Sequence, residues 1–313
     1  MLIVKKQEQK RRGPLHKRLT ILRYKYVSPS GLGKILWKIM RAVIIFGLCF
    51  IILYPYFSKI TSTFKSVRDL YNINIKYVPQ HFTTEYVGRI VKAMSYFQTA
   101  GYTALVCLLI ASLQTFVSAF VAYGFARFKF KGNRLLFGMV ILTLIVPPQT
   151  VMIPLYTKFR FFLGSINLIG TIAPMSILSL TCLGIRNGLY IFILRQFFRN
   201  LPHELEEAAY IDGNNMFQTF LKIILPSSIT MLTVIFVLSF CWQWTDTIFS
   251  SMFMSNMPLM VNKVGAVYDY TIDVLDAMLK NSAAVFAVAP LAIVYICLQN
   301  LFVQGIERSG ITG

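Results

Sequence analysis

The sequence contains six apolar stretches that are each long enough to cross the hydrocarbon core of a membrane, about 30 Å, as an α-helix of roughly 20 residues. Apolar residues make up 56% of the chain and charged residues only 14%, which is more apolar than a typical soluble protein. We therefore predict an all-α, multi-pass membrane protein with six transmembrane helices. The predicted spans lie near residues 38–58, 98–126, 135–156, 168–194, 224–245 and 284–305.

Prolines and glycines predict that three of these spans are not straight. Pro147 and Pro148 in the third span, and Pro226 at the start of the fifth, predict bends because proline cannot donate a backbone hydrogen bond. In the fourth span, Pro174 and the glycines within 184–188 predict a kink or a broken helix.

The distribution of basic residues predicts the orientation in the membrane. The chain has 31 Lys and Arg against 12 Asp and Glu, a net charge of +19. Twenty of the basic residues fall on the side of the N-terminus and ten on the other side, and the basic side of a membrane protein is usually cytoplasmic. Both termini are therefore predicted to be cytoplasmic. The basic side comprises 1–41, 127–134, 195–223 and the tail, and the other side comprises 59–97, 157–167 and 246–283.

These assignments predict three parts of the chain. Residues 1–37 form a basic cytoplasmic segment, which we expect to contact anionic lipid rather than nucleic acid. No cleavable signal peptide is predicted, because the first apolar run begins only after residue 41 and fits a retained span. Residues 38–310 form the transmembrane domain, with extracytoplasmic loops at 59–97 and 247–283, and residues 311–313 form a C-terminal tail.

The residues that commonly bind metals or perform catalysis are scattered. Five cysteines lie in apolar stretches without a CxxC pair, and three histidines are isolated, so neither a disulfide framework nor a metal site is predicted. The chain also lacks a phosphate-binding GxxxxGK[ST] motif and any pattern of a catalytic triad. We therefore expect a non-catalytic chain that binds no cofactor.

The cytoplasmic segment 199–226 predicts two short helices around a turn. Glu204, Glu206 and Glu207 fall in the first turns of the first helix, where the helix dipole favours negative charge. Gly213 can adopt the left-handed conformation that ends this helix, and Asn214 or Asn215 can cap the next.

Two interpretations of this segment remain. It could be a simple membrane-surface hairpin that connects two spans. Alternatively, the small pair Ala208 and Ala209 would let another protein backbone approach closely, and the flanking carboxylates would attract a basic partner.

The spacing within 199–226 resembles the EAA loop of ABC-importer permease subunits. The matching residues are Glu207-Ala208-Ala209, followed by Gly213, Ile223 and Leu225-Pro226. Additional segments resemble the carbohydrate-uptake branch, in particular the maltose-type second permease, whose fold is that of a type I importer. The resemblance covers roughly residues 38–310, and these segments are 122–132, 145–149, 153–156, 194–198 and 242–246.

The resemblance implies a larger complex in a bacterial cell membrane. Its members would be a sister permease, with which this chain forms a heterodimer, two ATPase subunits that carry ATP and magnesium, and an extracytoplasmic solute-binding protein. Glu207 would be the polar contact to the ATPase, Ala208 and Ala209 its close-packing face, and Gly213 the turn. The full set of expected coupling residues is Glu206, Glu207, Ala208, Ala209, Asp212, Gly213, Phe217, Leu225 and Pro226.

The expected substrate is a sugar or an oligosaccharide. Because sugars are uncharged and rich in hydroxyl groups, their path needs hydrogen-bonding groups and aromatic rings. Candidate path residues are Gln114, Ser118, Tyr123, Gln149, Trp242, Gln243 and Trp244, although tryptophans near span ends are also common as interfacial anchors. The loop 247–283 would probe the binding protein, or it would be a simple tether.

Two alternatives to a sugar permease remain. One is an ABC permease for a non-sugar solute, and the other, more distant, is an ATP-independent secondary transporter. The second usually requires carboxylates within the spans, whereas Arg186 is the one clear ionisable residue deep in a predicted span. The sequence departs from the sugar branch at Thr245, where Asn is common, and in a tail that lacks Lys before the final Gly.

Overall fold

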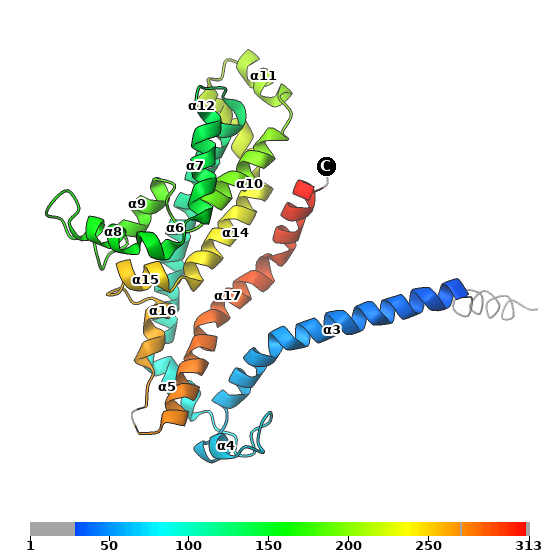
Figure 1. The fold of residues 1–313 in the computed structure, drawn as a ribbon, viewed down its shortest axis with the longest axis vertical. Helices are drawn as coiled ribbons and strands as arrows, with labels where there is room; N and C mark the ends of the chain where they lie inside the picture. The colour runs from blue at the N-terminus through cyan, green and yellow to red at the C-terminus, as the bar shows by residue number, and fades with distance from the viewer. Residues whose placement is uncertain (1–28, 270, 311–313) are drawn as a thin grey trace, which may run out of the picture. The chain divides into compact units, whose positions relative to one another are not determined.

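The computed structural model describes residues 29–269 and 271–310, and all regular elements in these ranges are helical (Figure 1). The predicted segment 1–37 lies mostly outside the described residues, and the predicted tail 311–313 lies entirely outside them. The chain divides into two units, with the boundary between Thr61 and Ser62. The first unit contains most of helix α3 (Pro29–Thr63). The all-α prediction is confirmed.

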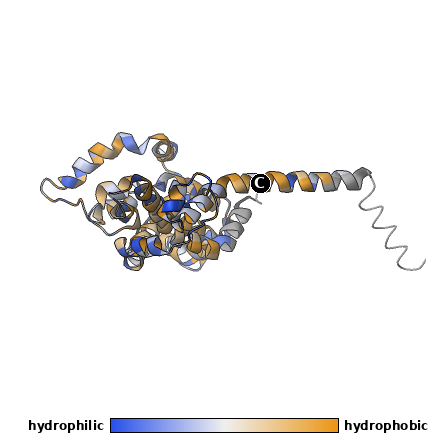
Figure 2. Cartoon of the chain, turned by 90° about the horizontal axis from the view of Figure 1, so that it is seen from below, coloured by the Kyte–Doolittle hydropathy of each residue, from blue (hydrophilic) through white to orange (hydrophobic). Residues whose placement is uncertain are grey.

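Within the described residues, three helices are long and apolar enough to cross a membrane unbroken. They are α3, with its candidate span at Leu36–Thr63, α6 (Tyr96–Arg127), and α17 (Asp273–Gly310), with its candidate span at Asp273–Gln299. Apolar side chains along α3 are exposed, and Figure 2 shows this long helix as mostly hydrophobic. That pattern is expected of a helix surrounded by lipid.

Two other predicted spans are sharply bent pairs of helices. Helices α7 (Asn133–Ile145) and α8 (Pro148–Arg160) meet at 101°, and Met216–Ser227 meets α14 (Ile229–Thr245) at 81°. Pro148 is the first residue of α8, a position where the missing N–H of proline costs nothing. The bends expected from the prolines are confirmed. With these pairs counted as spans, five of the six predicted spans are accounted for.

The predicted fourth span consists of two short helices, α9 (Ala173–Leu180) and α10 (Asn187–Arg199). Cys182 and Arg186, in the link between them, both have left-handed backbones, with φ of 62° and 60°. The expected break is therefore present. Gly188 also serves in packing, because a Cβ atom there would lie 2.9 Å from the carbonyl oxygen of Val140 on α7.

Helix α6 is the centre of the second unit. One apolar cluster joins it to α5 (Glu85–Ala93), α14 and α17, a second joins it to α10 and α14, and a third packs it against α8, α9 and α15 (Ile248–Phe253). A displacement of α6 would therefore act on most of this unit.

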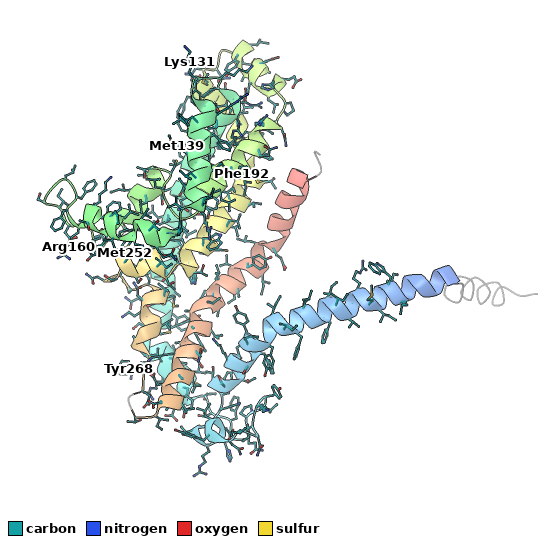
Figure 3. The ribbon with its side chains drawn as sticks, viewed as in Figure 1. Lys131, Met139, Arg160, Phe192, Met252 and Tyr268 are labelled. Carbon is teal, nitrogen blue, oxygen red and sulfur yellow. The ribbon has the colours of Figure 1, made fainter. Side chains whose placement is uncertain are left out.

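Some of the loops that the charge distribution assigns to opposite sides of the membrane lie at opposite ends of the second unit, whereas Arg160, in the outer segment 157–167, lies between these ends (Figure 3). Helices α11 (Glu204–Ile211) and α12 (Met216–Thr219) lie at one end, and α4 (Val67–Tyr71) and α5 lie at the other (Figure 1). Lys131 and Tyr268, on loops predicted to face opposite sides of the membrane, likewise lie at these two ends (Figure 3).

The predicted outer loop 247–283 contains regular structure. It contains α15, α16 (Met260–Lys263) and the short 3₁₀ helix η2 (Val264–Ala266). Helix α17 then begins at Asp273, well before the predicted span start at residue 284.

Candidate functional site

The hairpin at 199–226 begins with α11, whose first turn carries Glu204, Glu206 and Glu207. Gly213 ends the helix with φ of 80°, as predicted. The N–H of Gly213 donates to the carbonyl of Tyr210 at 3.1 Å, and the N–H of Asn214 donates to that of Ala209 at 3.0 Å. This pair of bonds satisfies carbonyls that the helix end would otherwise leave unpaired.

The second half of the hairpin begins with a capping box. The side chain of Asn215 accepts from the N–H of Gln218 at 2.9 Å, and the side chain of Gln218 accepts from the N–H of Asn215 at 3.0 Å. Of the two asparagines considered, Asn215 is therefore the cap. Helix α12 continues through a π-helical turn, η1 (Phe220–Ile224), into α13 (Leu225–Ser227).

Helix α11 presents two different faces. Glu206 and Ala209 are buried within this chain, whereas Glu207 and Ala208 are exposed and Ile211 is 86% exposed. The expectation that Ala208 and Ala209 share one partner-facing surface is therefore not met in this chain, because Ala209 packs inward. We define the docking face as the exposed residues Glu207, Ala208, Ile211, Asp212, Met216 and Phe217.

The remaining coupling candidates close the hairpin. Gly213 and Pro226 are exposed, and Leu225 is half-buried next to η1. They shape the turn and the exit of the hairpin toward α14.

Arg127, in the last turn of α6, holds the inner face of α11. Its Nε lies 2.7 Å from Oε1 of Glu206, and the two side chains are only 3% and 9% exposed. Its Nη2 donates to the carbonyl of Leu201 at 2.8 Å, and its Nη1 lies 3.1 Å from Nε2 of His203. One guanidinium thus fastens the start of the hairpin to the end of the central helix.

Aromatic rings fasten the second half of the hairpin to the same helix. The Phe220 ring lies 5.6 Å from the Phe120 ring and 5.2 Å from the Tyr123 ring, measured between centroids. Phe217 also contacts Phe120, at 6.3 Å. Tyr123, a candidate path residue, is buried in this cluster. Both halves of the hairpin are therefore attached to α6.

Most of the other candidate path residues are buried between helices. The Ser239 hydroxyl of α14 donates to the side-chain oxygen of Gln114, and Asn187 Nδ2 of α10 donates to Ser118 Oγ at 3.1 Å. Gln243 is also buried. Trp244 is buried and donates from Nε1 to the carbonyl of Ala287 on α17 at 3.0 Å. Gln149, by contrast, is exposed.

A cavity of about 570 Å³ lies where the broken helices meet. Its wall comes from α7, α8, the α9–α10 link, α14 and the start of α15, and it includes Met139, which Figure 3 labels on α7. Trp242 lines this cavity, and the guanidinium of Arg186 lies over its ring at 4.5 Å from the centroid. The sequence singled out both residues but not their contact.

The family of the chain follows from comparison with known proteins. The family model described as "Binding-protein-dependent transport system inner membrane component" matches residues 114–308, which include the hairpin and the cavity. The chain belongs to this family of transport permeases.

Relatives with sugar-related names match most of the chain. It is 28% identical over 220 residues to the melibiose/raffinose/stachyose import permease protein MelC of Bacillus subtilis, covering 68% of this chain and 72% of MelC. It is 24% identical over 274 residues to the arabinooligosaccharides transport system permease protein AraQ of Halalkalibacterium halodurans. The match covers 85% of this chain and 93% of AraQ.

A solved structure supports the fold. It comes from a bacterial ABC transporter involved in the import of the acidic polysaccharide alginate, and it superposes with a TM-score of 0.70 at 19% identity. The match covers 88% of this chain and 98% of that chain. The fold is therefore that of an ABC importer permease.

Proposed function

We propose that this chain is a transmembrane subunit of an ATP-driven importer, and that its hairpin at 199–226 couples the transport path to partner ATPase subunits. The observation that carries the proposal is the attachment of the hairpin to α6 through the buried Arg127–Glu206 ion pair. In this account, a push on the docking face moves α6, because both halves of the hairpin are fixed to that helix.

The docking face suits a partner protein. It combines exposed apolar side chains, notably Ile211 and Phe217, with the carboxylates of Glu207 and Asp212. Apolar groups exposed on a polar hairpin gain free energy when a partner covers them, and the carboxylates would select a basic partner. A hairpin that only connected two spans would not require this surface.

The proposed complex has the orientation that the charge distribution predicts. The hairpin faces the cytoplasm, where ATP is available to two ATPase subunits. The opposite end, with α5 and the loop 247–283, faces an extracytoplasmic solute-binding protein. This chain forms half of the translocation path, and a sister permease forms the other half.

The proposed substrate is a sugar or an oligosaccharide. Support comes from the names of the relatives MelC and AraQ. A non-sugar solute is the alternative, and the identity of the solute that stimulates ATP hydrolysis by the assembled importer decides between them.

Ala208→Trp tests the coupling role. The bulky indole would prevent close approach of a partner at the exposed face of α11 without entering the core of this chain. The variant should reach the membrane in normal amounts but lose ATP-driven uptake. The matched control is Tyr71→Trp, because Tyr71 is 60% exposed at the opposite end of the unit. Normal uptake by Ala208→Trp would rule out the proposed docking face.

A further inference from the structure

Arg186 places a positive charge in the cavity wall. Among the residues that the structure describes, no carboxylate oxygen lies within 4.0 Å of its guanidinium. It lies in a predicted span, where ionisable residues are costly and usually mark a substrate or ion pathway. The guanidinium is therefore free to bind an anionic group that enters the cavity.

The backbone and the ring below it orient this guanidinium. Arg186 precedes the first residue of the 13-residue helix α10 and is left-handed, with φ of 60° and ψ of 13°. Its guanidinium lies over the Trp242 ring. A guanidinium stacked through its face keeps its N–H donors free in its own plane, and these donors match the two oxygens of a carboxylate. The N-terminus of α10 adds positive potential at the same place.

The cavity wall also contains a carboxylate, Asp246, whose two oxygens both accept backbone hydrogen bonds. Its Oδ2 accepts from the N–H of Ser250 at 2.6 Å, and its Oδ1 accepts from the N–H of Phe249 at 3.3 Å. These bonds hold both oxygens at the first turn of α15, and Asp246 forms no ion pair with Arg186 within 4.0 Å.

We propose that this cavity binds an acidic sugar residue, with its carboxylate on Arg186 and the apolar face of its ring against Trp242. The volume of about 570 Å³ falls in the range of small-ligand sites, roughly 300–1,000 Å³. The inference rests on the proposed function and adds the substrate class, a sugar that carries a carboxylate such as a uronic acid.

Cys182 provides a reporter inside this cavity. It lines the wall and is a free thiol, so its rate of alkylation by a maleimide measures occupancy. The other four cysteines would be replaced by alanine: Cys49, Cys107, Cys241 and Cys297. The probes are a galacturonic acid trisaccharide and its carboxyl-reduced, neutral counterpart, added to the importer purified with its partner subunits.

The acidic trisaccharide should protect Cys182 at a concentration about tenfold lower than its neutral counterpart does, because a hydrogen bond to a charged group adds roughly that factor in affinity. Arg186→Gln should remove this difference, and Arg186→Lys should retain part of it. The matched control is Arg160→Gln, because Arg160 also lies near an aromatic ring, that of Phe161, but does not line the cavity. Figure 3 labels Arg160 on α8. This control should behave as the parent.

Equal protection by the two trisaccharides, or an undiminished preference in Arg186→Gln, would overturn the acidic-sugar site. Co-purification of each variant with its partners shows that it has folded, and Arg186→Lys serves in place of Arg186→Gln if the latter does not assemble. Uptake separates the two proposals. Import of neutral sugars alone contradicts only this inference, whereas an importer that no sugar stimulates contradicts the proposed sugar function itself.

Discussion

Nε of Arg127 lies 2.7 Å from Oε1 of Glu206, and both side chains are buried where the central helix α6 meets α11. A buried charge that loses its partner is costly, so this pair keeps α11 in one position relative to α6. The neighbouring residue, Glu207, points outward and is exposed. Two consecutive glutamates therefore lie in different environments, because Glu206 is buried in an ion pair and Glu207 is exposed.

Glu206→Gln should destabilise the hairpin. The change leaves the Arg127 guanidinium buried without its counter-charge, at a cost of about 3 kcal/mol. Hydrogen exchange of residues 204–219 in the purified protein should become faster. Glu207→Gln is the matched control and should change stability by no more than about 0.5 kcal/mol, as exposed substitutions usually do. Equal effects of the two changes would contradict the role of the ion pair.

Gly213→Ala should loosen the turn of the hairpin through backbone strain. No atom lies within 4 Å of a Cβ placed there, so the cost comes from the φ of 80°, about 1–2 kcal/mol for a residue with a side chain. Gly88→Ala in α5 is the control, because its site is equally open but its φ is not positive. The thermal unfolding temperature should fall for Gly213→Ala and should not fall for Gly88→Ala.

Gly188→Ala should separate α10 from α7. Its Cβ would lie 2.9 Å from the carbonyl oxygen of Val140 and would also meet the Thr143 hydroxyl, so the helices must move apart at a cost of about 1–3 kcal/mol. Gly138→Ala on α7 is the comparison, since nothing lies within 4 Å of a Cβ there. The free energy of unfolding of both variants can be measured by denaturant titration in detergent. Equal values for Gly188→Ala and Gly138→Ala would exclude this close packing.

Protonation of Asp269 should release a contact at the opposite end of the unit. Its carboxylate accepts from the hydroxyl and the N–H of Thr271 and from Nη1 of Arg89 at 2.8 Å, and these bonds lower its pKa to about 2. Because this pKa lies below the ordinary value, about 3.9, the contact stabilises the loop above about pH 4. That stabilisation is lost as the pH falls toward 2.

The loosening of the loop between pH 4 and pH 2 can be measured as the rate at which pepsin, which is active at these pH values, cleaves within 247–272. Cleavage should increase as the pH falls from 4 to 2. Arg89→Gln should already show faster cleavage at pH 4. The control Arg68→Gln, at an exposed residue of α4, should match the parent. A cleavage rate that does not respond to Arg89→Gln would show that this contact does not order the loop.

The sequence predicted those features of the hairpin that depend on near neighbours in the chain. Gly213 and Asn215 act through backbone groups within a few residues, so their roles follow from residue type and spacing alone. The bend at Pro147 and Pro148 follows for the same reason, although its angle of 101° depends on the packing of α7 and α8 against other helices.

Features set by distant contacts could not be predicted in this way. Ala208 and Ala209 are consecutive, and only the packing of α11 decides that one is exposed and the other buried. From the sequence, Arg127 contributes only a positive charge to the predicted orientation, because its partner Glu206 is 79 positions away along the chain. The sequence did contain one signal. Glu206 and Ala209 are three positions apart and so share one face of α11, which indicates that this face packs inward. A buried glutamate in turn requires a cation as its partner.

The measurement that tests the central claim most directly is ATP hydrolysis and uptake by this chain purified with its native partners and reconstituted in liposomes. We predict ATP hydrolysis that a sugar-loaded binding protein stimulates, with uptake that Ala208→Trp abolishes although the complex remains in the membrane. Accumulation of solute by this chain alone, without ATP and without partner subunits, would contradict the account.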